Sequence, residues 1–176
     1  GIIMCRHLIG IVVGLFLFIN YGCQKSVPEN MYTDPQYQFR ISIPDSGWTL
    51  TDETGISQVL VIIRSKGMCD GFMPNVTVSV EILPYMTTAV EYGKRNQESL
   101  MKQGYKIRGG KETVINQNTF YEVQCINHHA SSSMQFRYLC LVKDRVGYII
   151  TCTAPEKLYA NFVGDFECIV QTFRFL

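Results

Sequence analysis

Seven cysteines are the side chains with the widest range of chemistry in this sequence of 176 residues. Thiolates act as nucleophiles, redox centres and ligands for soft metal ions. Two lie in the N-terminal segment, which leaves Cys69, Cys125, Cys140, Cys152 and Cys168. Five thiols cannot all pair, and the Cys-x-x-Cys spacing of zinc sites and redox dithiols does not occur. Thiol chemistry still provides one alternative for the function, a thiol-dependent redox protein or another enzyme of the envelope. This alternative requires an accessible thiol of lowered pKa.

Two adjacent histidines, His128 and His129, are the other candidate ligands or general bases. Neighbouring residues on a strand point to opposite faces, so these side chains cannot hold one ion together unless the chain bends. We expect both to be solvated residues at the end of a hairpin. Motifs for a serine nucleophile, a P-loop, a zinc protease or an EF-hand do not occur in the sequence. The sequence predicts no catalytic residue, no metal site and no cofactor.

Alternation of apolar and polar residues predicts the strands that position these side chains. Strands are expected over residues 37–43, 48–51, 58–63, 76–83, 105–113, 120–127, 134–143 and 147–153. Thr88 with Glu91, and Thr153 with Glu156, have the spacing of helix capping boxes, with helices expected to end near Gln103 and Gln171. Consecutive hairpins force an antiparallel meander, on which amphipathic helices must bury their apolar stripes. The predicted fold is α+β, an antiparallel β-sheet meander flanked by two amphipathic helices.

Three of the cysteines fall on the last three predicted strands. The alternation directs Cys125, Cys140 and Cys152 into one layer. With a turn at residues 144–146, Cys140 is expected near Ile150 and Cys152 near Tyr138. Since none of the three thiols then lies opposite another, we expect them to act as small buried apolar side chains.

The N-terminal residues have the pattern of a secretion signal. A short positive segment at residues 5–7 precedes an unbroken apolar run of 12 residues at positions 8–19. A run of this length is typical of a signal peptide, whereas a membrane-spanning helix needs about 20 apolar residues. We therefore expect residues 1–22 to be a signal peptide.

The junction Gly22-Cys23 resembles a bacterial lipobox, although Asn20 replaces the usual leucine. The resemblance implies that Cys23 carries a lipid, with palmitate among its acyl chains, and that the protein contacts the membrane through this anchor. Because Gln24 is not the aspartate associated with inner-membrane retention, a periplasm-facing position on the outer membrane is favoured. A signal peptide cut elsewhere and an uncleaved anchor remain alternatives.

Residues 23–36 are polar and contain two prolines. This composition predicts a lipid-anchored tether that lets a domain clear the lipid headgroups. The globular domain is expected to occupy residues 37–176.

The loop over residues 66–74 is unusual because it combines apolar side chains with two glycines. Met68, Cys69, Phe72 and Met73 must either be buried or be used for contact. We keep two interpretations: a loop folded over the edge of the sheet, and a loop that contacts a partner. A disulfide between Cys69 and Cys168 also stays open, since both lie outside the predicted sheet.

Composition and charge limit the function further. The chain is 47% hydrophobic and has a net charge of +1, from 16 basic and 15 acidic residues. This composition is typical of a folded domain. A balanced charge provides no basic footprint for nucleic acid.

Several segments resemble PsbP-like and DcrB-like domains. The residues that carry the resemblance are the stretch from Tyr37 to Trp48, Thr88 to Tyr92, Gly147 to Thr151, and Phe166 to Phe175. The resemblance covers residues 37–176 and implies a Mog1/PsbP-like α/β/α sandwich. Proteins of this kind are mostly accessory or binding proteins, and they share no catalytic motif that could be transferred.

The favoured function is therefore a non-enzymatic lipoprotein of the cell envelope. It would bind a protein or a small ligand, or assist an envelope complex. A purely structural spacer is a third hypothesis, which predicts a surface without a deep pocket.

Overall fold

The computed structural model describes residues 30–43, 47–129 and 132–176. The predicted signal peptide and Cys23 lie outside these residues. Within them, no helix combines the length and the apolar character needed to cross a membrane.

The main element is an antiparallel sheet with the strand order β3-β4-β5-β9-β8-β7-β6. The last four positions, β9-β8-β7-β6, form the predicted meander. The strands are β3 (Trp48–Thr51), β4 (Val59–Ser65), β5 (Asn75–Ile82), β6 (Lys106–Ile115), β7 (Asn118–His129), β8 (Ser132–Lys143) and β9 (Val146–Pro155).

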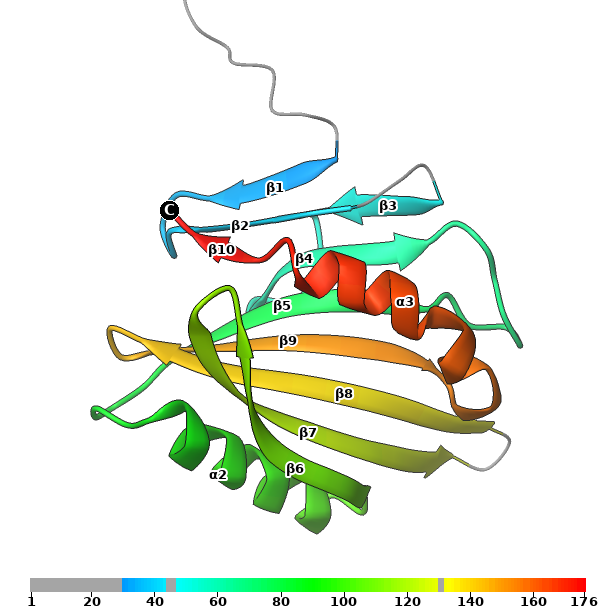
Figure 1. The fold of residues 1–176 in the computed structure, drawn as a ribbon. Helices are drawn as coiled ribbons and strands as arrows, with labels where there is room; N and C mark the ends of the chain where they lie inside the picture. The colour runs from blue at the N-terminus through cyan, green and yellow to red at the C-terminus, as the bar shows by residue number, and fades with distance from the viewer. Residues whose placement is uncertain (1–29, 44–46, 130–131) are drawn as a thin grey trace, which may run out of the picture.

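Two further layers cover the main sheet, as Figure 1 shows. Helix α2 (Ala89–Lys102) lies on one face. Helix α3 (Tyr159–Val170) lies on the other face, beside a small sheet of β1 (Met31–Asp34), β2 (Phe39–Ser42) and β10 (Arg174–Phe175). The described residues therefore confirm the predicted α+β fold, with helices on both faces of an antiparallel sheet.

Helix α2 begins and ends as its sequence predicts. The Glu91 amide donates to Thr88 Oγ1 at 3.1 Å, and the Thr88 amide donates to Glu91 Oε2 at 3.0 Å. Gly104 follows the helix with a φ of +87°, the left-handed conformation that glycine adopts without strain. In the middle of α2, Gly93 lets the helix approach β7 closely, because a Cβ there would lie 2.5 Å from Cβ of Tyr121.

The second predicted capping box does not form. Thr153 pairs with Phe136 on β8 and with Asn75 on β5, and the ladder with β8 continues beyond it, so the backbone stays extended as far as Pro155. A 3-10 helix, η1 (Glu156–Leu158), then leads into α3, and neither helix has a side-chain cap. Tertiary pairing thus overrides a local capping signal.

The folded part of the chain begins earlier than predicted. Strand β1 lies within the expected tether of residues 23–36 and pairs with β2, with Met31 opposite Ser42. Buried Asp34 holds the following turn, since its Oδ1 accepts from the Gln36 amide at 2.9 Å and the Tyr37 amide at 2.7 Å. Residues 31–36 are therefore part of the domain.

The hairpin between β8 and β9 also differs from the prediction. Its turn has two residues, Asp144 and Arg145, both with positive φ, and Lys143 pairs with Val146. Cys140 then lies opposite Ile149, and Cys152 lies opposite Arg137. Because a shift of one residue reverses the faces of a strand, Cys152 points into the layer opposite to that of Cys125 and Cys140.

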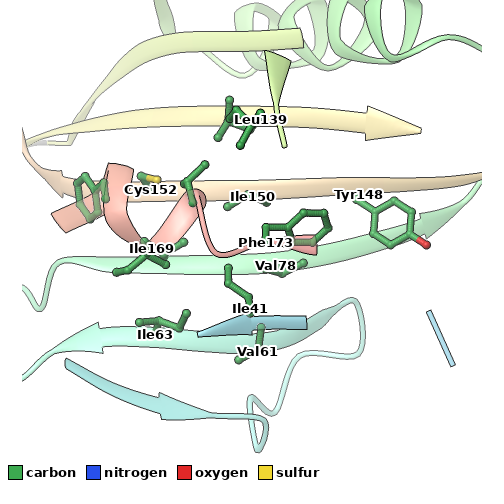
Figure 2. Close-up of a cluster of buried hydrophobic side chains, with 14 of the residues drawn as sticks. Ile41, Val61, Ile63, Val78, Leu139, Tyr148, Ile150, Cys152, Ile169 and Phe173 are labelled. Carbon is green, nitrogen blue, oxygen red and sulfur yellow. The ribbon is translucent and has the colours of Figure 1, made fainter. Parts of the chain in front are cut away.

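The main hydrophobic core fills the space between the large sheet and α3 with the small sheet. Figure 2 shows side chains from β2, β4, β5, β8, β9, α3 and the C-terminal segment meeting there, among them Ile41, Val61, Val78, Ile150 and Phe173. Smaller clusters under α2 include Tyr121, Val123, Cys125 and Leu100, and Tyr92 with Cys140.

Candidate functional site

The three cysteines of the sheet are fully buried, as predicted, although they occupy two layers. Burial raises the pKa of the Cys125 thiol to about 11 and the pKa values of Cys140 and Cys152 to about 12. At neutral pH these groups are protonated thiols shielded from solvent. A redox function that uses these three cysteines is therefore wrong.

The disulfide between Cys69 and Cys168, which the sequence left open, does not form. Among the described residues, all five cysteines are free, with Cys168 exposed on α3 and Cys69 partly buried in its loop. His128 is exposed, and its Nδ1 lies 2.6 Å from Ser133 Oγ across the end of the β7–β8 hairpin. Within the described part of the chain, no group of three or more His, Cys, Asp or Glu side chains could hold a metal ion.

The loop over residues 66–74 is a small hairpin. The Cys69 amide donates to the Phe72 carbonyl at 2.7 Å and the Phe72 amide to the Cys69 carbonyl at 2.9 Å, around a turn at Asp70 and Gly71. Both turn residues have positive φ, as such a tight turn requires. We call residues 66–74 the Met hairpin, because Met68 and Met73 are 63% and 41% exposed.

The structure separates the four side chains predicted for this loop. Phe72 lines a cleft of about 720 Å³, together with residues from the end of β7, the start of β8 and η1: Asp70, Gly71, His128, Ser132, Ser133, Met134, Pro155, Glu156 and Lys157. Figure 1 shows that all these segments lie at one end of the sheet. Met68 and Met73 do not line the cleft and face solvent.

A second cleft, which the sequence analysis missed, adjoins the first at Glu156. We call it the charged groove. It has a volume of about 480 Å³ and lies between α3 and the outer strands β6, β7 and β8. Its lining is mostly polar: Lys111, Thr113, Glu122, Gln124, Gln135, Arg137, Glu156, Tyr159, Ala160, Val163 and Glu167.

Arg137 is the centre of the charged groove. Its NH2 group lies 3.1 Å from Glu122 Oε2 on β7, and its NH1 group lies 2.7 Å from Glu167 Oε2 on α3. The side chains of Arg137 and Glu122 are only 16% and 5% exposed, whereas that of Glu167 is 44% exposed. In the described part of the chain, Arg137 Nε is buried and has no hydrogen-bond partner.

The two carboxylates are held in place by neighbouring amides. Gln124 Nε2 donates to Glu122 Oε1 at 2.6 Å, and Gln171 Nε2 donates to Glu167 Oε1 at 2.9 Å. Burial acts to raise the pKa of Glu167, but the hydrogen bonds from Gln171 and Arg137 outweigh it and lower the pKa. Glu167 is thus an anion at neutral pH, suited to bind a cation rather than to donate a proton.

A weak signal for this groove is present in the sequence. Glu122 and Gln124 are in phase with buried Phe120 on β7, and Arg137 is in phase with buried Leu139 on β8. Polar residues at core-facing positions indicate either a buried polar network or a part of the sheet that no other layer covers. The partner Glu167 is far away in the sequence, so only the fold reveals the network.

Comparison with known proteins identifies the fold. No protein-family model and no curated protein matches the chain. Its structure is similar to that of cyanobacterial PsbP (CyanoP) from Synechocystis sp. PCC 6803, with a TM-score of 0.59 and 15% identity over 88% of this chain and 98% of that one. It is also similar to PA94, a Pseudomonas aeruginosa protein of unknown function, with a TM-score of 0.57 and 14% identity over 81% of this chain and 93% of that one.

A third similar structure is a protein from Bacteroides thetaiotaomicron VPI-5482, with a TM-score of 0.55 and 11% identity. The match covers 84% of this chain and 48% of that one. At such low identity the comparisons concern the fold alone. They agree with the resemblance read from the sequence: the chain has a PsbP-like α+β fold.

Proposed function

We propose that the protein is a non-enzymatic accessory lipoprotein of the bacterial cell envelope. It is anchored to the periplasmic side of the outer membrane through a lipid on Cys23, and it binds a protein partner through the Met hairpin. The observation that carries the proposal is this hairpin, which presents two exposed methionines on a backbone fixed by a two-residue turn. A PsbP-like fold supports an accessory role.

The Met hairpin is suited to protein contact for two physical reasons. Methionine side chains are flexible and polarizable, so they adapt to irregular apolar surfaces. The backbone beneath them is already ordered by the Cys69–Phe72 hydrogen bonds and by buried Pro74, whose carbonyl accepts from the Ser65 amide at 2.8 Å. Little loop entropy would therefore be lost on binding.

Photocrosslinking in cells tests this contact. With a photoreactive phenylalanine analogue at position 68 or 73, we expect the same crosslinked protein from both positions, because the two side chains lie on one hairpin. Position 101 is the matched control, since Met101 is 57% exposed on α2, on the other face of the sheet. Crosslinking of one product from all three positions, or of none from 68 and 73, would exclude the contact.

Intact-mass measurement of the membrane-purified protein tests the anchor and the absence of thiol chemistry. We expect a chain that begins at lipid-modified Cys23. In the native state, alkylation should modify Cys168 and Cys69, whereas Cys125, Cys140 and Cys152 should react only in denaturant, because burial keeps them protonated.

A chain without lipid would contradict the anchor. Native alkylation of any of the three buried thiols at the rate of exposed Cys168 would contradict the inert core and reopen a thiol-dependent function.

A further inference from the structure

The charged groove is an open cleft whose lining residues all lie in described parts of the chain. One wall is the β6–β7 hairpin, which rises toward the face that α3 covers, and the other wall is α3 itself. Asn116 ties the hairpin tip to the end of α3, since its Nδ2 donates to the carbonyls of Gln171 at 2.7 Å and Phe173 at 3.0 Å. At the opposite end, Arg108 lies 2.7 Å from Glu156.

The size and lining of this groove indicate a small polar ligand. A volume of about 480 Å³ lies in the range of small-molecule sites, which is roughly 300–1,000 Å³. Ala160 and Val163 are the aliphatic residues of the lining, and the other lining residues carry side-chain amides, hydroxyls or charged groups. Such a lining does not favour a lipid or an aromatic ligand.

The floor of the groove contains buried polar groups. Tyr159 is buried, and its hydroxyl makes no hydrogen bond to any described residue, although its ring packs on Phe166 with centroids 5.4 Å apart. Glu122 is almost fully buried and faces the same space as Arg137. Arg137 Nε is buried and has no hydrogen-bond partner in the described part of the chain, and such an unpaired buried donor favours a role in recognition.

Charge is separated across the groove. The β6 wall carries Lys111, which has no ion-pair partner among the described residues. The helical wall carries Glu156 and Glu167. Arg137 and Glu122 on the floor compensate each other. The lining therefore contains two cations and three carboxylates, a balance that does not favour a simple anion, while unpaired Lys111 leaves one cation free to meet a carboxylate.

A ligand with both charges matches this separation. Its carboxylate would meet Lys111, and its ammonium group would meet Glu167 or Glu156, whose exposed pair with Arg108 is weak enough to open.

We infer that the charged groove binds a zwitterionic ligand of the amino-acid class, namely a free amino acid or a short peptide. The Met hairpin contributes no residue to the lining of the charged groove and lines only the adjoining cleft. The ligand site therefore does not depend on the proposed protein partner.

Isothermal titration of the full-length protein in detergent with L-alanyl-L-alanine tests the inference. Two matched probes each lack one charge: the N-acetylated dipeptide and the dipeptide amide. We expect binding of the dipeptide and about tenfold weaker binding of each capped form, the size expected for one lost charge contact. Equal binding of the three probes, no binding of the dipeptide at millimolar concentration, or tighter binding of glucose would overturn the inference.

Replacement of Lys111 assigns the carboxylate end. In Lys111→Met, the dipeptide should bind about tenfold more weakly, while the amide, which has no carboxylate, should bind as it does to the original protein. Lys111 is exposed, so the variant should fold. Lys94→Met is the matched control, because Lys94 is exposed on α2 on the other face of the sheet. Equal weakening of both probes, or no change in either, would refute the role of Lys111.

Discussion

Replacement of Arg137 by methionine is expected to lower the free energy of unfolding by about 3–5 kcal/mol, the range observed when one partner of a buried ion pair is removed. The variant would leave the Glu122 carboxylate, only 5% exposed, without its cation. Burial alone would lower the pKa of Arg137, yet the hydrogen bond that it donates to Glu167 and the charges of both glutamates raise the pKa, so the guanidinium is always charged. Urea unfolding at neutral pH measures the effect.

Two further variants distinguish the effect of burying the ion pair from the effect of its charge. Glu167→Gln should lower the free energy of unfolding by about 0–1 kcal/mol, because that carboxylate is 44% exposed and solvent screens its pair. The double variant Arg137→Met with Glu122→Gln should recover part of the loss, since the buried group is then neutral. If Arg137→Met lowered the free energy of unfolding no more than Glu167→Gln, the ion-pair network would not contribute to stability through the buried Glu122.

The β-strands and helix α2 could be predicted because their signals are local. The strict alternation in residues 76–83 corresponds to β5, and the capping box at Thr88 forms as expected. The Met hairpin was identified as a loop with the correct limits, since β4 ends at Ser65 and β5 begins at Asn75. Periodicity and capping depend on residues within a few positions of each other, so both can be read from a single sequence.

Errors arose where distant segments decide the outcome. Thr153 and Glu156 have the capping spacing, but Thr153 is held in the ladders with β5 and β8, and pairing with β8 extends β9 through Pro155. The face of Cys152 depends on whether the β8–β9 turn has two or three residues, and both choices fit the sequence around Asp144. One residue of register decides between two layers.

The charged groove was beyond sequence reasoning for a related reason. Its floor is formed by neighbouring strands, but its wall is α3, whose position depends on the packing of Phe166 and Ile169 into the main core. In the sequence, the polar residues on β7 and β8 give only a weak signal, their phase with Phe120 and Leu139. Only the curvature of the β6–β7 hairpin and the place of α3 enclose them.

Phe173 is the residue whose truncation should destabilise the apolar core most strongly. Its ring is 1% exposed and lies 5.3 Å from the ring of Phe39 in a stacked arrangement, with edge contacts to Phe120 at 6.2 Å and Tyr148 at 6.4 Å. These contacts join the C-terminal segment to β2 near the other end of the chain, as well as to the main sheet (Figure 2). Phe173→Ala should therefore lower the free energy of unfolding by about 3–5 kcal/mol, measured by urea unfolding.

Phe175 is the internal control for this prediction. It is partly buried, and its ring contacts Tyr148 at 5.2 Å and lies 4.1 Å from Lys143 Nζ. Because solvent reaches it, Phe175→Ala should lower the free energy of unfolding by only about 1 kcal/mol. Phe173→Leu, which keeps most of the apolar volume, should fall between the two alanine variants. Equal losses for Phe173→Ala and Phe175→Ala would mean that the aromatic cluster does not hold the C-terminal segment to the sheet. The Asn116 bonds to Gln171 and Phe173 would then be the contacts that keep α3 in position over the charged groove.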